Sequence, residues 1–180
     1  GLFATLLTLL QPDDEVLIPD PGFVLYSAVI KIVGGQPVTY PLYASNDFDL
    51  SVDDITERIT SRTRAILINS PNNPTGRIID RSQLEQLTEI AAAHDLYVIS
   101  DEVYDTIDYT GNFSSAWGLT DKVIVLGGAS KTFAMTGWRL GWVIGDLDIM
   151  SKINIAHHYM VACAPAIAQR VMARLLTGDG

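Results

Sequence analysis

The chain has 180 residues, 48% of them hydrophobic, which is enough for one sizeable core and about one domain. Its net charge of −9 and pI near 4.6 give an acidic surface that repels phosphate backbones, so we expect no nucleic acid partner for this segment. No apolar run approaches the ~18 residues that a bilayer-spanning helix needs, and no signal peptide is visible, so we expect a cytoplasmic protein without a membrane partner.

Apolar periodicity and turn residues predict an alternation of helices and strands. In chain order we expect a helix at 2–10, a strand at 15–19, a helix at 23–33, a strand at 37–40, an amphipathic segment at 49–59, a strand at 65–69, a helix at 81–94, strands at 96–100, 123–126 and 140–145, and helices at 149–160 and 164–176. Pro165 would lie in the first turn of the last helix, where proline is tolerated.

This order of elements predicts an α/β fold with three layers, α-β-α, around a mostly parallel mixed sheet. Strands that are separated by helices pair in parallel and carry helices on both faces. The strands at 123–126 and 140–145 are joined without a helix of any length, so the last strand is expected to run antiparallel.

Cysteine and histidine usage gives no sign of a metal site. A single cysteine, Cys163, excludes an internal disulfide and a cysteine-based zinc site, and its run of small neighbours predicts a packed structural thiol. The three histidines show no ligand spacing with acidic residues.

The strand at 65–69 runs into a stiff turn, Ser-Pro-Asn-Asn-Pro-Thr-Gly, that fixes Asn73 ahead of Pro74. An amide held there can reach an oxygen of a bound ring. Taken alone, Asn73 is equally well explained as a turn former, because Asn-Pro is a frequent turn dipeptide.

Asp101 and Tyr104 follow the next buried strand. The carboxyl ends of such strands are where open α/β sheets bind ligands. A carboxylate can keep the nitrogen of a pyridine ring protonated, and a phenol can donate to an oxygen on the same ring. Singly, Asp101 is explained as a helix N-cap and Tyr104 as a half-buried core residue.

Lys131 lies directly after Ser130 and eight residues before Arg139. A lysine amine condenses with an aldehyde when its surroundings keep a neutral fraction. A hydroxyl and a guanidinium suit phosphate oxygens, and the small residues between them let the backbone come close. An aldehyde that carries a phosphate is pyridoxal phosphate. Read alone, the segment is equally an ordinary solvated loop, and Arg139 a member of a surface ion pair.

Taken as a set and in this order, the Asn-Pro-Thr-Gly turn, the Asp-Glu-Val-Tyr strand end and the Ser-Lys segment resemble the class I/II aminotransferases. These are fold type I enzymes that use pyridoxal 5′-phosphate, and the resemblance covers nearly the whole chain. It implies that Lys131 is the catalytic Schiff-base lysine and that Asp101 is the partner of the pyridine nitrogen. Asn73 and Tyr104 would donate to the phenolic oxygen of the ring.

The resemblance also assigns the rest of the cofactor site. Ser130 and Arg139 would hold the phosphate, and Phe23, after the Pro-Gly of an Asp-Pro-Gly-Phe segment, would stack on the ring. Many relatives carry a second hydroxyl residue where this chain has Gly128. That departure puts the detailed phosphate contacts in doubt, and a backbone N–H is the candidate replacement.

Residues 1–180 would then be an incomplete large domain that binds the cofactor. Gly1 opens straight into an apolar helix, and in relatives an edge strand and a glycine-rich phosphate loop come before this point. Relatives continue past the final helix into a smaller domain, which contributes the arginine that grips the substrate carboxylate. We expect both parts to be missing here.

The implied reaction is amino-group transfer between an L-amino acid and a 2-oxo acid, in a protein that is a homodimer when intact. Three alternatives stay open: a C–S lyase or decarboxylase of the same fold, an aminotransferase-like effector domain of a transcriptional regulator, and a scaffold that binds no cofactor. In dicarboxylate-specific relatives an arginine in the region that corresponds to 156–160 meets the distal carboxylate of the substrate. Residues 156–160 contain no arginine here, so the resemblance implies neutral or aromatic substrates.

Overall fold

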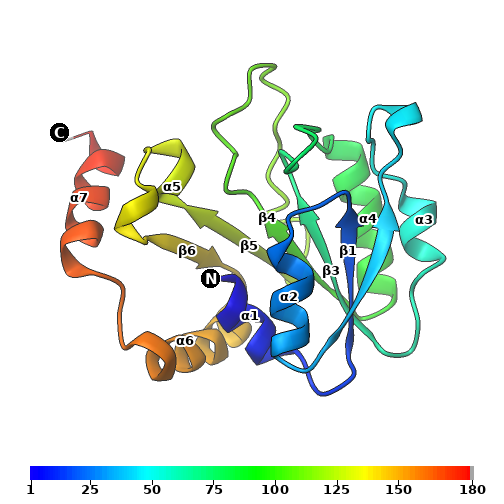
Figure 1. The fold of residues 1–180 in the computed structure, drawn as a ribbon, viewed down its shortest axis with the longest axis horizontal. Coiled ribbons are helices and arrows are strands. Elements are labelled where there is room, and N and C mark those ends of the chain that lie inside the picture. Colours follow the sequence, from blue (N-terminus) through cyan, green and yellow to red (C-terminus); the bar gives the residue numbers. More distant parts are fainter. Residues whose placement is uncertain (179–180) are drawn as a thin grey trace.

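The computed structural model describes residues 1–178 and has one six-stranded sheet between two layers of helices (Figure 1). The strands are β1 (Glu15–Asp20), β2 (Gln36–Pro41), β3 (Thr63–Asn69), β4 (Tyr97–Asp101), β5 (Val123–Gly128) and β6 (Gly141–Ile144). The helices are α1 (Leu2–Leu9), α2 (Leu25–Ile32), α3 (Val52–Thr56), α4 (Arg81–Ala93), α5 (Ala129–Thr132), α6 (Leu147–Val161) and α7 (Ala166–Thr177), with two 3-10 turns, η1 (Ala44–Asn46) and η2 (Thr136–Trp138). Within this described part, no helix is both long and apolar enough to cross a membrane.

The strand order is β2-β1-β3-β4-β5-β6, and every neighbouring pair is parallel except β5 and β6. The antiparallel pair has a local cause. Between β5 and β6 the chain holds only the four-residue α5 and the turn η2, whereas a parallel return usually crosses the sheet through a full α-helix. The mixed sheet expected from the sequence is therefore confirmed, with the odd strand in its expected place.

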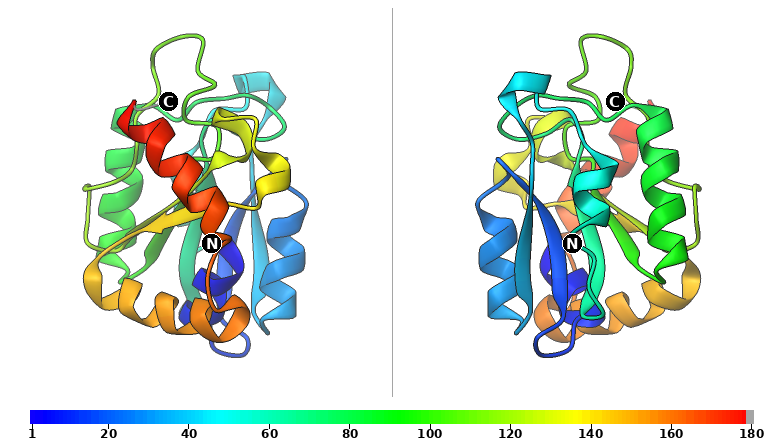
Figure 2. Two further views of the ribbon diagram at one scale, coloured as in Figure 1. Left: turned by 90° about the vertical axis from the view of Figure 1, so that its left-hand side faces the viewer. Right: turned by 90° about the vertical axis from the view of Figure 1, so that its right-hand side faces the viewer.

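Alternate residues of the strands face opposite helical layers. Ile66 and Ile68 pack with α3 and α4, whereas Ala65 and Leu67 pack with α1, α2 and α6. The edge-on views show the two layers with the sheet between them (Figure 2). The three-layer arrangement follows from these nearly continuous apolar strands, because each strand must be covered on both faces.

One expected element is shorter than its amphipathic pattern suggested. The segment 49–59 forms only the five-residue α3, which begins after Ser51, whose hydroxyl accepts a hydrogen bond from the backbone N–H of Asp54 at 3.1 Å. The chain leaves the helix at Thr56 and enters β3 at Thr63. The amphipathic spacing therefore continues beyond the end of the helix. Pro165 is the N-cap of α7 and lies just before its first turn, with φ −56° and ψ 122°.

The prediction of a packed thiol is wrong. Cys163 is exposed, in the short link between α6 and α7. The chain leaves α6 at Ala162, whose φ of 62° is left-handed, and the link then passes over the surface. Its small residues fit this sharp change of direction and do not indicate burial.

Candidate active site

The site lies at the carboxyl edge of the sheet, where four strands end. β1 leads to Phe23, β3 to Asn73 and β5 to Lys131, while β4 ends at Asp101 itself. Because β6 is antiparallel, its amino end lies at the same edge, and Arg139 comes just before it. Segments far apart in the sequence therefore meet at one place, as expected for an open α/β sheet.

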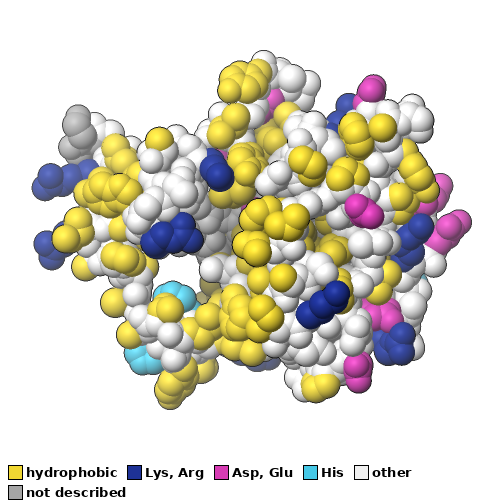
Figure 3. Space-filling model, viewed as in Figure 1, with side chains coloured by type: hydrophobic (Ala, Val, Ile, Leu, Met, Phe, Trp, Pro, Cys, Tyr) yellow, Lys and Arg dark blue, Asp and Glu magenta, His cyan; other side chains and the backbone are white. Residues whose placement is uncertain are grey.

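These segments surround a cavity of about 370 Å³, a size at which pockets begin to hold small molecules. All seven residues singled out from the sequence line it, namely Phe23, Asn73, Asp101, Tyr104, Ser130, Lys131 and Arg139. The space-filling view shows a hollow on this face, between the part of the molecule formed by α5, α6 and α7 and the part that carries α1 and α2 (Figure 3).

Asp101 is fixed by two hydrogen bonds. Its Oδ2 accepts from the hydroxyl of Tyr26 at 2.8 Å, and its Oδ1 accepts from the backbone N–H of Val103 at 3.3 Å. Burial raises the pKa of Asp101, and the two hydrogen bonds partly oppose this shift. Burial, followed by the charge and hydrogen bond of Asp101, raises the pKa of Tyr26 far above its ordinary value, so the phenol stays a donor. Asp101 is therefore not a helix N-cap, because the structure begins no helix there.

Tyr26 was missed by the sequence reasoning. It lies on α2, three residues after Phe23, and the two rings meet edge to face, with centroids 5.5 Å apart and planes at 83°. Only 1% of its surface is exposed. The available signal was this spacing, which places two aromatic residues on one side of a helix entrance. In an apolar helix, however, the sequence does not distinguish a buried tyrosine that belongs to a site from one that belongs to the core.

Lys131 is on α5, and its Nζ lies 5.6 Å from the centre of the Tyr104 ring. The loop that follows Tyr104 is joined to the same helix. Thr106 donates a hydrogen bond to the hydroxyl of Thr132 at 2.8 Å, and that hydroxyl donates to Asp105 at 3.3 Å. The hydrogen bond between the hydroxyls of Thr106 and Thr132 therefore helps to hold Tyr104 beside Lys131.

Ser130 and Arg139 are connected through Thr136. The guanidinium of Arg139 donates to the carbonyl of Thr136 at 2.8 Å, and the Thr136 hydroxyl donates to the carbonyl of Ser130 at 2.9 Å. Among the described residues, none of the ion pairs involves Arg139. Its charge is therefore available to an anion from outside the chain, which argues against its being a surface ion-pair member.

Known proteins match this chain along its whole length. The sequence model of the family described as aminotransferase class I and II matches residues 1–180. An aromatic-amino-acid aminotransferase of Thermococcus litoralis is 42% identical over 178 residues, which cover 97% of this chain and 46% of the relative. An arginine–pyruvate transaminase of Pseudomonas aeruginosa is also 42% identical, over 172 residues that cover 94% of this chain and 44% of the relative.

The fold agrees with these matches. The solved structure of an aspartate aminotransferase from Thermus thermophilus with maleate superposes with a TM-score of 0.96 at 32% identity, covering 99% of this chain and 47% of that one. The chain belongs to the class I and II aminotransferase family. It spans about half the length of the relatives that it matches.

Members of this family depend on pyridoxal 5′-phosphate, and the donor set of the cavity fits that cofactor. The cavity offers an amine for the aldehyde and a buried carboxylate for the pyridine nitrogen. It also offers a guanidinium free of ion pairs for the phosphate and an aromatic ring that can stack on the cofactor ring. The sequence resemblance is thus confirmed at the level of the family, the fold and the cofactor. The individual residue roles stay predictions.

Replacing Tyr26 by Phe in this aminotransferase chain is expected to weaken cofactor binding about tenfold or more, because one hydrogen bond to a charged group contributes roughly 1.5–3 kcal/mol and Asp101 would be held only by the backbone N–H of Val103. Titration with pyridoxal phosphate, followed by absorbance, measures the change. Tyr40→Phe is the matched control, since it also removes one buried hydroxyl, which donates to the carbonyl of Leu67 at 3.0 Å away from Asp101. Equal losses in both variants would contradict the role given to Tyr26.

Alanine substitution is expected to cost much more stability at Gly127 than at the adjacent Gly128. A Cβ at Gly127 would lie 2.0 Å from Nε1 of Trp142, the residue paired with it on β6, whereas a Cβ at Gly128 would meet its nearest atom, on Val103, at 3.5 Å. We expect Gly127→Ala to cost about 1–3 kcal/mol or more, as overpacking does, and Gly128→Ala to cost far less. Chemical denaturation of both variants checks this. Similar midpoints would mean that the Trp142 ring moves aside easily.

Proposed function

We propose that residues 1–180 are the cofactor-binding large domain of an aminotransferase, which transfers an amino group between an L-amino acid and a 2-oxo acid. One observation carries the proposal: Lys131, Asp101 and Arg139 line a single cavity at the ends of strands that the fold brings together. Three unrelated turn or surface residues would not be expected to place an amine, a carboxylate and a guanidinium around one space of this size.

The proposed chemistry divides among the residues by their charge. When bound, the cofactor supplies a protonated pyridine ring that accepts the electron pair left when the substrate α-carbon loses its proton. Lys131 would hold the cofactor at its aldehyde carbon, and its amine, when free, would act as the general base that moves a proton at the substrate α-carbon. Asp101 keeps the ring nitrogen protonated, because a carboxylate against it favours the charged form.

The remaining groups hold the cofactor in place. Ser130 and Arg139 would bind the phosphate, with the backbone at Gly128 in place of the hydroxyl that many relatives carry there. Phe23 would lie against the ring and exclude water from it. Asn73 and Tyr104 would donate to the phenolic oxygen, and the contact between the Lys131 amine and the Tyr104 ring supports that placement.

We further propose a neutral or aromatic amino acid as the substrate, a homodimeric assembly and a cytoplasmic location. The absence of arginine from residues 156–160 supports the substrate class. Apolar side chains exposed over α1 and α2, including Leu7, Leu25 and Ile32, would suit an interface with a second copy (Figure 3). A lone cysteine fits a reducing compartment.

The test is an assay of the complete protein that contains this chain, loaded with pyridoxal phosphate. Amino acid plus 2-oxoglutarate should yield a 2-oxo acid and glutamate in equal amounts. Release of pyruvate and ammonia from a sulfur amino acid without 2-oxoglutarate would mean a C–S lyase, and release of carbon dioxide would mean a decarboxylase. A protein that binds cofactor but turns over none of these substrates would favour a regulatory domain and overturn the proposal.

A further inference from the structure

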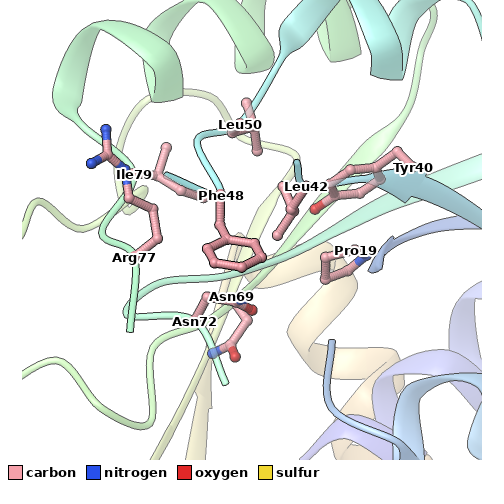
Figure 4. Close-up of a pocket in the computed structure, with 9 residues that line it drawn as sticks. All are labelled: Pro19, Tyr40, Leu42, Phe48, Leu50, Asn69, Asn72, Arg77 and Ile79. Atoms are coloured by element: carbon pink, nitrogen blue, oxygen red, sulfur yellow. The ribbon is translucent and has the colours of Figure 1, made fainter. Parts of the chain in front are cut away.

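A second buried amide, Asn69, lies beside the residues assigned to the cofactor. It is the last residue of β3 and only 3% of its surface is exposed. It borders two spaces, the large cavity and a small one of about 10 Å³ on the other side, where its side chain lies near that of Asn72 and below the ring of Phe48 (Figure 4). A polar side chain so deeply buried must have its hydrogen bonds satisfied.

Both ends of the Asn69 amide are used, and each holds a different part of the site. Its Oδ1 accepts a hydrogen bond from the backbone N–H of Asn73 at 2.7 Å. Its Nδ2 donates to the backbone carbonyl of Asp101 at 2.9 Å. Asn69 and Asp101 are paired in the parallel register of β3 and β4, so the amide reaches sideways across the sheet as well as forward into the turn.

The neighbouring amide has other partners. Asn72 donates to the hydroxyl of Thr75 at 2.9 Å and to the carbonyl of Pro21 at 3.4 Å, so it ties the turn to itself and to the segment before Phe23. Pro74 has no N–H, and the backbone hydrogen bonds of the turn join Asn72 to Arg77 and Gly76 to Asn72. The bond to Asn69 is therefore what anchors the N–H of Asn73.

We propose that Asn69 is a positioning residue that sets the separation between Asn73 and Asp101. This rests on the proposed function, in which those two residues meet the cofactor ring at its phenolic oxygen and at its nitrogen. A rigid amide with two short bonds fixes one residue relative to the other, so the ring is met by two groups already placed for it. Asn69 itself need not touch the cofactor.

The first test does not involve the cofactor. Amide hydrogen exchange of the chain, resolved by NMR, should show the Asn73 N–H protected in the wild type and about five- to tenfold less protected in Asn69→Ala, the effect of one lost hydrogen bond. Asn69→Asp keeps an acceptor oxygen in the same place and should restore the protection. Tyr40→Phe loses a different buried hydrogen bond, to the same strand, and should leave Asn73 protected as in the wild type.

The second test measures cofactor binding by the complete protein that contains this chain. Asn69→Ala should lower the affinity for pyridoxal phosphate about tenfold and raise the pH at which the visible absorbance of the bound cofactor titrates, since a donor to the phenolic oxygen is weakened. Unchanged Asn73 protection in Asn69→Ala, or a wild-type affinity and titration despite lost protection, would overturn the inference. A wild type that takes up no cofactor would instead overturn the proposed function, and with it the cofactor role of Asn69.

Discussion

Lys131→Ala in the complete protein is expected to abolish turnover and covalent attachment of the cofactor, while pyridoxal phosphate should still bind through the remaining contacts. Among the residues that the sequence reasoning placed in the cavity, Lys131 alone carries an amine that can form an imine with an aldehyde, and the same amine is the proposed proton carrier. Proton transfer by a positioned group alone is worth roughly 10²–10⁴-fold, so the loss in rate should be at least that large. The wild-type complex should have an absorbance band near the edge of the visible range that borohydride removes.

The control for this result is another lysine. Lys152 is exposed on α6 and does not line the cavity, so Lys152→Ala should keep both the band and the rate. A band that persists in Lys131→Ala and vanishes with borohydride would mean that a different amine holds the aldehyde. That finding would remove the residue on which the proposed mechanism depends.

Asp101→Asn is expected to have two opposite effects. The rate should fall by on the order of 10²–10³-fold, as when one preorganised electrostatic contact is removed, because an amide does not hold the ring nitrogen protonated. The cofactor-free protein should become more stable at neutral pH. Burial raises the pKa of Asp101 in the folded chain, so its ionised form is disfavoured there and removing the charge relieves that cost.

The sign of the pH dependence follows from the same shift. Stability of the cofactor-free wild type relative to Asp101→Asn should fall as the pH rises through the ordinary pKa of an aspartate, and should level off above the raised pKa of the folded chain. Denaturant midpoints from about pH 3 to about pH 8 measure this. Asp20 ends β1 as Asp101 ends β4 but is exposed, so Asp20→Asn should change neither activity nor the midpoints. A cofactor-free Asp101→Asn protein that is less stable than the wild type at neutral pH would contradict the destabilisation that we assign to the buried charge of Asp101.

The sequence was most informative where apolar strands end in polar residues. Runs such as those of β3 and β4 are long enough to be recognised as buried strands, and the rule that ligands bind at their carboxyl ends then placed Asn73 and Asp101 at one edge. The antiparallel β6 was predictable because no helix of crossover length separates it from β5. Family order supplied the position of Phe23, which neither periodicity nor spacing could have marked.

The sequence was least informative about buried polar residues that position other residues of the site. Tyr26 and Asn69 have apolar neighbours in their own elements, and their partners are 75 and 32 residues away along the chain. Nothing local distinguishes such a residue from a satisfied core residue, because the distinction is made only when distant segments meet. The prediction of a packed Cys163 was wrong because small residues occur both in close-packed cores and in sharp surface links.

The position of Cys163 makes residues 1–180 easy to label. It is the one thiol of these residues, it is exposed, and it does not line the cofactor cavity. On these residues a maleimide dye therefore attaches at one defined point, in the link between α6 and α7, without competing with the cofactor. Emission from that dye would report movement of the two final helices against the sheet, with no need to engineer a second attachment point.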